Sequence, residues 1–187
     1  MSSMIFIMAA GKAERHNGGN KPLLVVEGET LLDRMCRQAA GIRKYIVTHR
    51  DDLKNENANV LVPKSHDFFA DTLLSTVPCW KERNIILWGD VYYTDEVMKE
   101  ILAEERPLVA FGDNRDIYAA VFKMSEPVDW WLTKYVDAVR NNRHETGFFR
   151  GLIFAGFSKF VRVTDGTFDF DSPQEYKQFL NKERRHV

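Results

Sequence analysis

The stretch MIFIMAAGKAER, residues 4–15, decides the fold. Its first part, Ile5–Met8, is apolar without polar alternation, which is typical of a strand buried on both faces of a parallel sheet. The strand runs into a turn of small residues at Gly11. Farther along the chain, short apolar runs alternate with stretches of helical period, the pattern of strands joined by crossover helices. The sequence therefore predicts an α/β fold.

The other elements follow from similar patterns. Thr30 and Thr94 each precede apolar residues at helical spacing, so each is expected to cap a helix. The run Ser172-Pro173-Gln174-Glu175 combines a cap, an early proline and a glutamate, which predicts a last helix from Pro173. Further strands are expected at Tyr45–Val47, Val60–Val62, Ile85–Trp88, Leu108–Phe111 and Ile117–Met124, and further helices at Thr72–Trp80 and around Trp130–Val139.

Length and composition exclude several classes of protein. The 187 residues fit one domain, 1–187. Lys and Arg number 26 against 27 Asp and Glu, so no nucleic acid is expected as a partner. The apolar run Met4–Ala10 is far shorter than the roughly 20 residues of a membrane span and has no basic leader, so we expect no membrane association and a cytoplasmic location. Cys36 and Cys79 are isolated, which disfavours a disulfide or a zinc site.

The turn after the first strand has the composition of an anion-binding loop. Small residues let a backbone approach a ligand closely, and Gly11 could adopt a positive φ. Arg15 and Lys21, six residues apart, could flank a polyphosphate. An ordinary glycine-rich turn with surface cations explains the same residues equally well, and neither the dinucleotide fingerprint nor the P-loop pattern is present. The residues of this loop that could contact a nucleotide are Ala9, Ala10, Gly11, Lys12, Ala13, Arg15 and Lys21.

Carboxylates follow two other segments. Asp90 comes directly after the strand Ile85–Trp88, where an oxygen ligand for Mg²⁺ could lie, although Asp after Gly is also a common turn. Asp169 and Asp171 alternate with aromatic residues just before the last helix, and Asp171 or Ser172 could simply be its cap. In an α/β sheet, ligands bind beyond the carboxyl ends of the strands, so these turns are candidate sites.

Taken together, the motifs resemble a known family over most of the chain. Ala-Ala-Gly-x-Ala-x-Arg, Lys-Pro-Leu-Leu-x-Val-x-Gly-x-x-Leu-Leu-Asp-Arg, Leu-x-Gly-Asp-Val and Phe-Asp-Ser-Pro-Gln-Glu-Tyr occur in this order. The set is similar to the nucleotidyltransferases of the sugar-phosphate type, including the short molybdenum-cofactor guanylyltransferases and cytidylyltransferases. The resemblance implies a Rossmann-like, GT-A-like domain with a mixed, mostly parallel sheet flanked by helices.

The resemblance also implies an activity. A nucleoside monophosphate would pass from an NTP to a phosphorylated acceptor such as a sugar 1-phosphate, with Mg²⁺ as cofactor and pyrophosphate as product. Arg15, Lys21 and Asp90 would be catalytic, and Asp90 and Asp171 would hold the metal, with Asp169 as the replacement for Asp171. Thr72 resembles a residue near the nucleotide base, which is a weaker match. The family pattern is broken at His16, Tyr92 and an inserted Gly-Gly pair, but no charged group is lost.

The same resemblance divides the chain into a nucleotide-binding part, about 1–115, and an acceptor-binding and metal-completing part, about 116–187. Lys123 and Glu145 lie in the second part and are candidate acceptor contacts. The segment 147–157 could equally be core or a contact of a homo-oligomer. The sequence identifies neither the base of the NTP nor the acceptor.

Two other functions compete with nucleotidyl transfer. A GT-A-type glycosyltransferase shares the sheet, but it typically binds metal through Asp-x-Asp, and a single aspartate stands at Asp90. A non-catalytic regulatory module could keep the nucleotide site and lack turnover. Retention of Arg15, Lys21, Asp90 and Asp171 argues against that loss.

Overall fold

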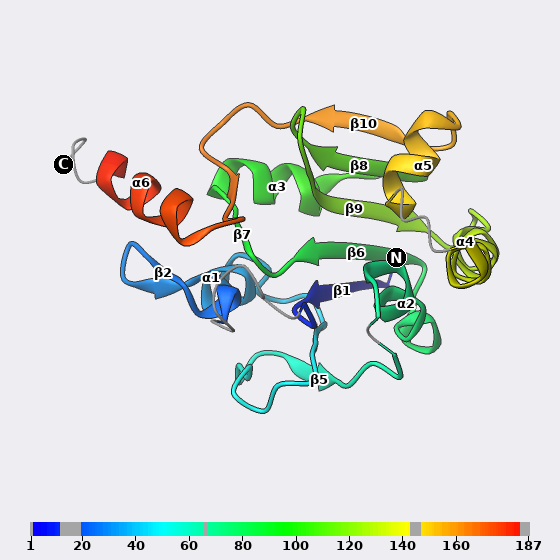
Figure 1. Ribbon diagram of the computed structural model, residues 1–187, viewed down its shortest axis with the longest axis horizontal. Helices are drawn as coiled ribbons and strands as arrows, with labels where there is room; N and C mark the ends of the chain where they lie inside the picture. The colour runs from blue at the N-terminus through cyan, green and yellow to red at the C-terminus, as the bar shows by residue number, and fades with distance from the viewer. Residues whose placement is uncertain (1, 12–19, 66, 143–146, 184–187) are drawn as a thin grey trace.

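A seven-stranded sheet forms the centre of the computed structural model, which describes residues 2–11, 20–65, 67–142 and 147–183 (Figure 1). The strand order is β10-β8-β9-β6-β1-β4-β5. All neighbours are parallel except β9, which is antiparallel to both β6 and β8. The mixed, mostly parallel α/β sheet expected from the sequence is therefore confirmed. The strands are β1 (Ser3–Met8), β4 (Lys44–Val47), β5 (Asn59–Leu61), β6 (Arg83–Trp88), β8 (Leu108–Gly112), β9 (Ile117–Lys123) and β10 (Lys159–Arg162).

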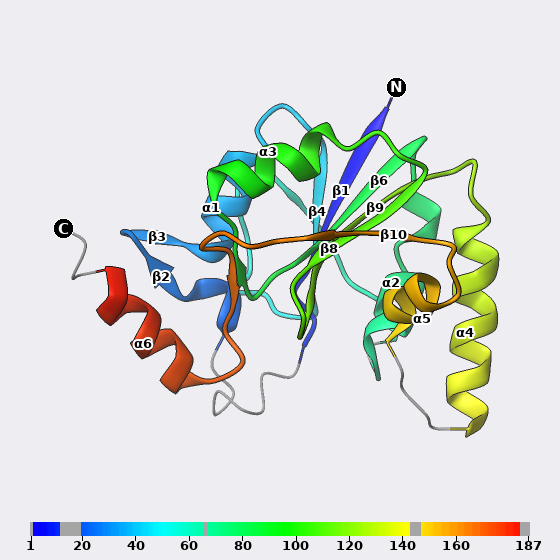
Figure 2. The ribbon, with the colours of Figure 1, turned by 90° about the horizontal axis from the view of Figure 1, so that it is seen from above.

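Helices cover both faces of the sheet, as the view from above shows (Figure 2). Helices α1 (Leu31–Gln38) and α3 (Asp95–Ala103) lie on one face, and α2 (Phe69–Leu74), α4 (Val128–Asn142) and α5 (Phe148–Phe154) lie on the other. Thr30 accepts a hydrogen bond from the Asp33 amide and Thr94 from the Val97 amide, so both expected caps are confirmed. Because each face has its own apolar cluster, the sheet is buried on both sides.

The ends of β1 and β6 lie side by side. Met8 is the partner of Trp88 in the parallel register, and the Gly89 amide donates to the Met8 carbonyl at 3.0 Å. A Cβ on Gly89 would stand 2.8 Å from that carbonyl oxygen, which real side chains avoid. Glycine is therefore required at position 89. The close approach that it allows places Asp90 at the carboxyl edge of the sheet, beside the end of β1.

The C-terminal segment returns to the same edge through a short ladder. Strand β11 (Phe168–Asp169) pairs antiparallel with β7 (Val91–Tyr92), so Asp169 lies opposite Val91. Phe170 is fully buried and packs edge-on against Tyr176 of helix α6 (Pro173–Glu183). This aromatic packing fixes residues 168–171 next to the turn at Asp90. On its other side, α6 lies beside the hairpin of β2 (Val25–Val26) and β3 (Glu29–Thr30), and the Tyr176 hydroxyl donates to the Val25 carbonyl at 2.6 Å.

One sequence expectation about the elements is wrong. The helix expected at Thr72–Trp80 begins earlier and ends at Leu74, and a separate 3₁₀ turn covers Val77–Cys79. Pro78 explains the break, because proline lacks the amide hydrogen that would bond the Leu74 carbonyl. Strand β10 was not expected from the sequence. Among the described residues, no helix is long and apolar enough to cross a bilayer.

Candidate active site

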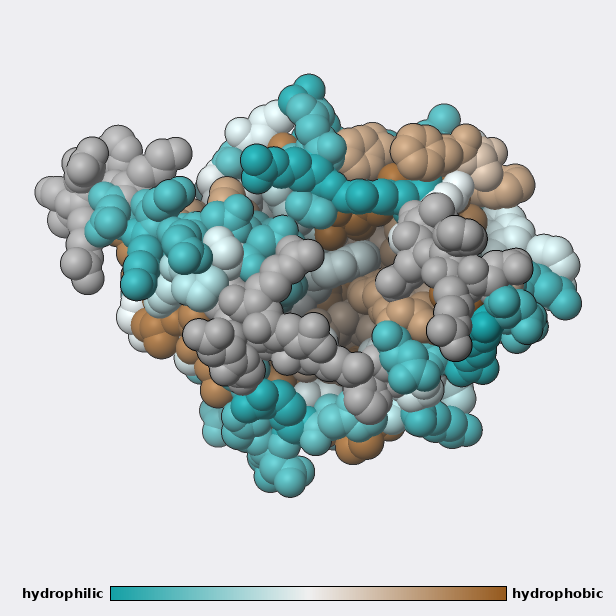
Figure 3. Space-filling view, in the orientation of Figure 1, coloured by the Kyte–Doolittle hydropathy of each residue, from teal (hydrophilic) through white to brown (hydrophobic). Residues whose placement is uncertain are grey.

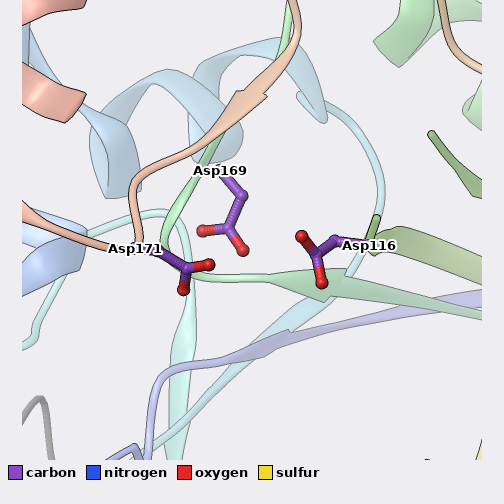
Figure 4. Close-up of side chains that lie close together, drawn as sticks. All are labelled: Asp116, Asp169 and Asp171. Carbon is purple, nitrogen blue, oxygen red and sulfur yellow. The ribbon is translucent and has the colours of Figure 1, made fainter. Parts of the chain in front are cut away.

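Three carboxylates from two segments of the chain converge at the carboxyl edge of the sheet. Asp116 precedes β9, and Asp169 and Asp171 belong to the segment paired with β7. One carboxylate oxygen of each lies within 4.8 Å of the other two, and the three side chains point toward a common space (Figure 4). Strand pairing produces this cluster, because β7 follows β6 directly and positions β11 beside it.

Lys21 joins Asp90 to this group. It begins a 3₁₀ turn, Lys21–Leu23, and its Nζ lies 2.9 Å from Asp90 Oδ2 and 3.8 Å from Asp171 Oδ1. Burial lowers the pKa of Lys21, but the carboxylates of Asp90, Asp169 and Asp171 together outweigh it, so the pKa lies above its ordinary value. The ammonium group is thus held in its charged form between the two aspartates.

Asp169 is the least satisfied of the carboxylates. Its Oδ1 atom is buried and has no hydrogen-bond partner among the described residues. Burial and, after it, the Asp90 carboxylate raise the pKa of Asp169 from 3.8 to about 8. The pKa of Asp116 is raised as well, first by burial and then by Asp171. The edge therefore holds more negative charge than the described cations neutralise.

This donor set fits a hard divalent cation. Mg²⁺ binds oxygens at about 2.0–2.1 Å in octahedral order, so its ligand oxygens stand about 3 to 4 Å apart. The separations in the cluster of Asp116, Asp169 and Asp171 approach this range, and the unpartnered oxygen of Asp169 is a ready acceptor. The sequence paired Asp90 with Asp171 as ligands. In the structure, both lie at this edge with Lys21 in contact with each.

A buried tyrosine fixes the strand ends beneath the site. The Tyr93 hydroxyl accepts from the Trp88 amide at 3.0 Å and donates to the Tyr118 carbonyl in β9. Tyr93 is fully buried, and this burial raises its pKa well above the usual value. The hydroxyl therefore acts as a neutral connector between β6 and β9, the two strands that position Asp90 and Asp116.

The first turn is described only in part. Ala9 is buried, Ala10 is half-buried and Gly11 is exposed. Gly11 does not have the positive φ that the sequence allowed, and a Cβ there would contact nothing. Lys12, Ala13 and Arg15 lie outside the described residues, as does Glu145.

Thr72 lies on α2, where its side chain is engaged within the helix. Its side chain is 6% exposed, and its hydroxyl donates to the Phe68 carbonyl one turn earlier. The residue serves the helix in this arrangement.

Lys123 requires a correction. It lies at the end of β9 opposite Arg83, the first residue of β6, and thus at the amino ends of the parallel strands. Because β6 spans six residues at about 3.3 Å each, Lys123 is far from the carboxyl edge. Its Nζ lies 3.0 Å from Glu105 Oε2. Lys123 therefore cannot contact an acceptor bound beside Asp90, since antiparallel pairing carries it to the opposite end.

The cap of the last helix is Ser172. Its hydroxyl accepts from the Glu175 amide at 3.3 Å and donates to the Glu175 carboxylate at 3.2 Å, so Ser172 caps the helix through its side chain. Asp171 is thereby relieved of the capping role that the sequence left open.

Sequence reasoning did not select two further residues of this site. Asp116 ends a turn in which Asp113 accepts from the amides of Arg115 and Asp116. Arg150 of α5 donates to Asp116 Oδ1 at 3.2 Å. The polar turn between two strands was the local signal for Asp116, whereas Arg150 had none, because its contact with Asp116 joins residues 34 positions apart.

Comparisons with known proteins identify the family and the fold. Residues 5–155 match the model of the family described as MobA-like NTP transferase domain. No curated protein matches the chain. Similar solved structures include a putative glucose-1-phosphate thymidylyltransferase from Bacillus anthracis, with a TM-score of 0.73, 12% identity, and 98% of this chain and 96% of that one covered.

A 4-diphosphocytidyl-2C-methyl-D-erythritol synthase from Anaerococcus prevotii has a TM-score of 0.71 and 13% identity over 98% of this chain and 96% of that one. The protein Rv0371c from Mycobacterium tuberculosis has a TM-score of 0.70 and 17% identity over 97% of this chain and 98% of that one. At these identities the likeness establishes a shared fold.

Proposed function

Because the chain belongs to the MobA-like NTP transferase family, we propose that it is a Mg²⁺-dependent nucleotidyltransferase. It transfers a nucleoside monophosphate from an NTP to a phosphorylated small-molecule acceptor, for which the sequence suggests a sugar 1-phosphate. Pyrophosphate is the second product. We propose the cytoplasm as the location of this reaction.

One observation carries the proposal: Lys21, Asp90, Asp116, Asp169 and Asp171 meet where β1 and β6 end. This is the edge at which α/β sheets bind ligands. The carboxylate excess suits a divalent cation, and the lysine suits a phosphate oxygen. Asp116 and the two late aspartates all come from the part about 116–187, which supports assigning the metal-completing role to that part.

The chemistry needs positioning more than a strong base. An acceptor phosphate oxygen forms a bond to the α-phosphorus of the NTP as the bond from that phosphorus to the pyrophosphate oxygen breaks, and the electron pair leaves with pyrophosphate. Such an anionic nucleophile requires no deprotonation, so the main barrier is bringing two anions together. Mg²⁺ held by the aspartates would supply neutralisation of phosphate charge when bound.

The chain's own cation completes this arrangement. Lys21 contacts two carboxylates, and it could turn from them to a phosphate oxygen once a metal balances their charge. We propose that Arg15 and the backbone of Ala9, Ala10 and Gly11, with Lys12 and Ala13, hold the triphosphate from the other side. Thr72 would then support the base side only through its helix.

The test is an incubation with each of the four NTPs, Mg²⁺ and a panel of phosphorylated acceptors, in which released pyrophosphate is measured. We expect release that requires one class of acceptor and stops in excess EDTA. Release of a free nucleoside diphosphate from a nucleotide sugar would favour a glycosyltransferase instead. Nucleotide binding without any turnover would favour a regulatory module.

A further inference from the structure

An aromatic wall borders the carboxylate cluster. Trp88, two residues before Asp90, stacks on Phe69 of α2 with ring centroids 4.7 Å apart. Phe149 of α5 packs against both rings, at 6.0 Å from Trp88 and 6.4 Å from Phe69. Trp88 and Phe69 keep part of their surface accessible, whereas Phe149 is buried behind them. On the face of the molecule drawn in Figure 3, hydrophobic side chains are visible in a hollow near the middle.

The polar groups of α2 beside this wall lie inside the fold. Asp71 is 2% exposed; one of its carboxylate oxygens pairs with Arg140 of α4, and the other is buried without a hydrogen-bond partner among the described residues. The Thr72 hydroxyl donates within its own helix. A polyhydroxylated ligand needs a hydrogen-bond partner for each buried hydroxyl, since an unpaired one is costly. A planar apolar ring needs none and gains from contact with Trp88 and Phe69.

A cation on the same helix as Phe149 contacts the carboxylate cluster. Arg150 follows Phe149 in α5, so the same helix presents an aromatic ring and a guanidinium group at adjacent positions. The Arg150 side chain is 47% exposed, and it reaches Asp116 of the cluster at 3.2 Å. Guanidinium groups bind phosphate oxygens in pairs, and an exposed ion pair is weak enough to exchange its partner.

We propose that the acceptor is a phosphomonoester with a planar apolar ring, which binds with its phosphate on Arg150 and its ring on Trp88 and Phe69. This rests on the proposed nucleotidyl transfer and specifies its acceptor. The phosphate would then lie beside the carboxylate cluster and next to Asp90, where the NTP is expected. The sugar 1-phosphate suggested by the sequence becomes the weaker ligand.

The experiment compares 1-naphthyl phosphate with glucose 1-phosphate, which carry the same phosphate on different bodies. Binding of each is measured by calorimetry to the full chain with Mg²⁺, and binding of the four NTPs is measured separately. We expect 1-naphthyl phosphate to bind at least about 10-fold more tightly, because one side chain's worth of apolar surface is buried. Equal or tighter binding of glucose 1-phosphate would overturn the inference.

Variants assign the two halves of the subsite. Arg150→Gln should weaken both phosphomonoesters about 10- to 100-fold and leave NTP affinity unchanged. Arg106→Gln is the matched control, because Arg106 is 51% exposed, pairs with Glu104 and lies at the opposite edge. Trp88→Ala should remove the preference for the naphthyl ring, and Trp88→Phe should keep it.

If Trp88→Ala does not fold, Phe69→Leu tests the same point, because leucine keeps most of the apolar volume of Phe69 but has no ring. Unchanged affinities in Arg150→Gln would overturn the phosphate assignment, and an unchanged preference in both Phe69→Leu and Trp88→Ala would overturn the ring assignment. If no NTP binds, the proposed function itself fails. If an NTP binds and the ring preference is absent, only the acceptor inference fails.

Discussion

The two edges of the central sheet both carry charged residues, but these charges are balanced at the amino edge and unbalanced at the carboxyl edge. At the amino edge, Arg83 is 4% exposed and donates to the carbonyls of Glu104 and Leu102 at 2.9 and 2.7 Å. These carbonyls belong to the C-terminal end of α3, where a cation is also favoured by the helix dipole. Lys123 pairs with Glu105 at the same edge. Each of these cations thus has its partners within the chain.

The carboxyl edge is unbalanced by comparison. Asp90, Asp116, Asp169 and Asp171 gather around Lys21 and Arg150, and a buried oxygen of Asp169 has no hydrogen-bond partner among the described residues. Satisfied charges stabilise a fold, whereas an unbalanced buried cluster costs stability and is retained for a ligand. Both edges carry charged side chains, so residue type alone does not distinguish them. They differ in whether those charges are balanced by partners within the described residues.

The sharpest contrast between the edges concerns two lysines. Lys21→Ala should lower kcat/KM about 10²- to 10³-fold, because it removes a pre-placed cation from the phosphate site. Lys123→Ala should leave kcat/KM within about 2-fold, since its partner is a surface carboxylate. Steady-state pyrophosphate release measures both. Comparable losses in the two variants would erase the distinction between the edges.

Substitutions at the amino edge should affect stability and not turnover. Arg83→Met should lower the free energy of unfolding by about 2–4 kcal/mol, because buried carbonyls lose charged donors, with kcat/KM of the folded enzyme kept. Arg106→Met, at an exposed site, should change it by about 0.5 kcal/mol or less. Urea unfolding followed by fluorescence provides the values. A stable Arg83→Met protein with reduced turnover would contradict a structural role for this edge.

The unbalanced edge should also have a pH signature in the metal-free protein. The pKa of Asp169 is raised from 3.8 to about 8, so between these values the folded state binds more protons than the unfolded state. This contribution to stability is present at low pH and is lost as pH rises toward 8. Asp169→Asn should therefore have a higher Tm than the parent protein at pH 8 and a similar Tm at pH 4.5. A lower Tm for the variant at pH 8 in EDTA would show that Asp169 is satisfied within the fold.

The smallest expected effect separates neighbouring residues of one loop. Ser172→Ala should cost about 1 kcal/mol of stability through loss of the cap, with little change in turnover. Asp171→Asn should leave stability nearly unchanged and lower Mg²⁺-dependent turnover. Thermal unfolding and pyrophosphate release, measured on the same preparations, test the pair. Exchange of the two phenotypes would return Asp171 to a capping role.

Much of the fold could be predicted because its signals are local. Three kinds of local signal depend on residues close in sequence: the buried run of β1, the caps Thr30 and Thr94, and the cap Ser172. Strand β11 could not be found this way, because its two residues form a strand only by pairing with β7 about 77 positions earlier. Long-range pairing leaves no periodicity in a segment of that length.

The part of the site that could be predicted consists of residues in motifs that directly follow a predicted strand or precede a predicted helix. Lys21, Asp90 and Asp171 were selected from sequence, and the structure brings these three together. Asp116 was missed because its importance comes from the register of β8 and β9, and Lys123 was misplaced because antiparallel pairing reverses the direction of β9. Both errors concern how strands pair, in register or in direction, which residue patterns alone do not reveal.

We expect the unbalanced edge to bind a divalent cation together with an NTP. The decisive measurement is calorimetric titration of each NTP, with and without Mg²⁺, into the parent protein, Asp171→Asn and Lys123→Ala. At least one NTP should bind in Mg²⁺, and EDTA should weaken this binding strongly. Asp171→Asn should abolish the Mg²⁺ effect, and Lys123→Ala should keep it. NTP binding that is equally tight in EDTA, or no binding of any NTP, would show that this edge is not a metal and nucleotide site.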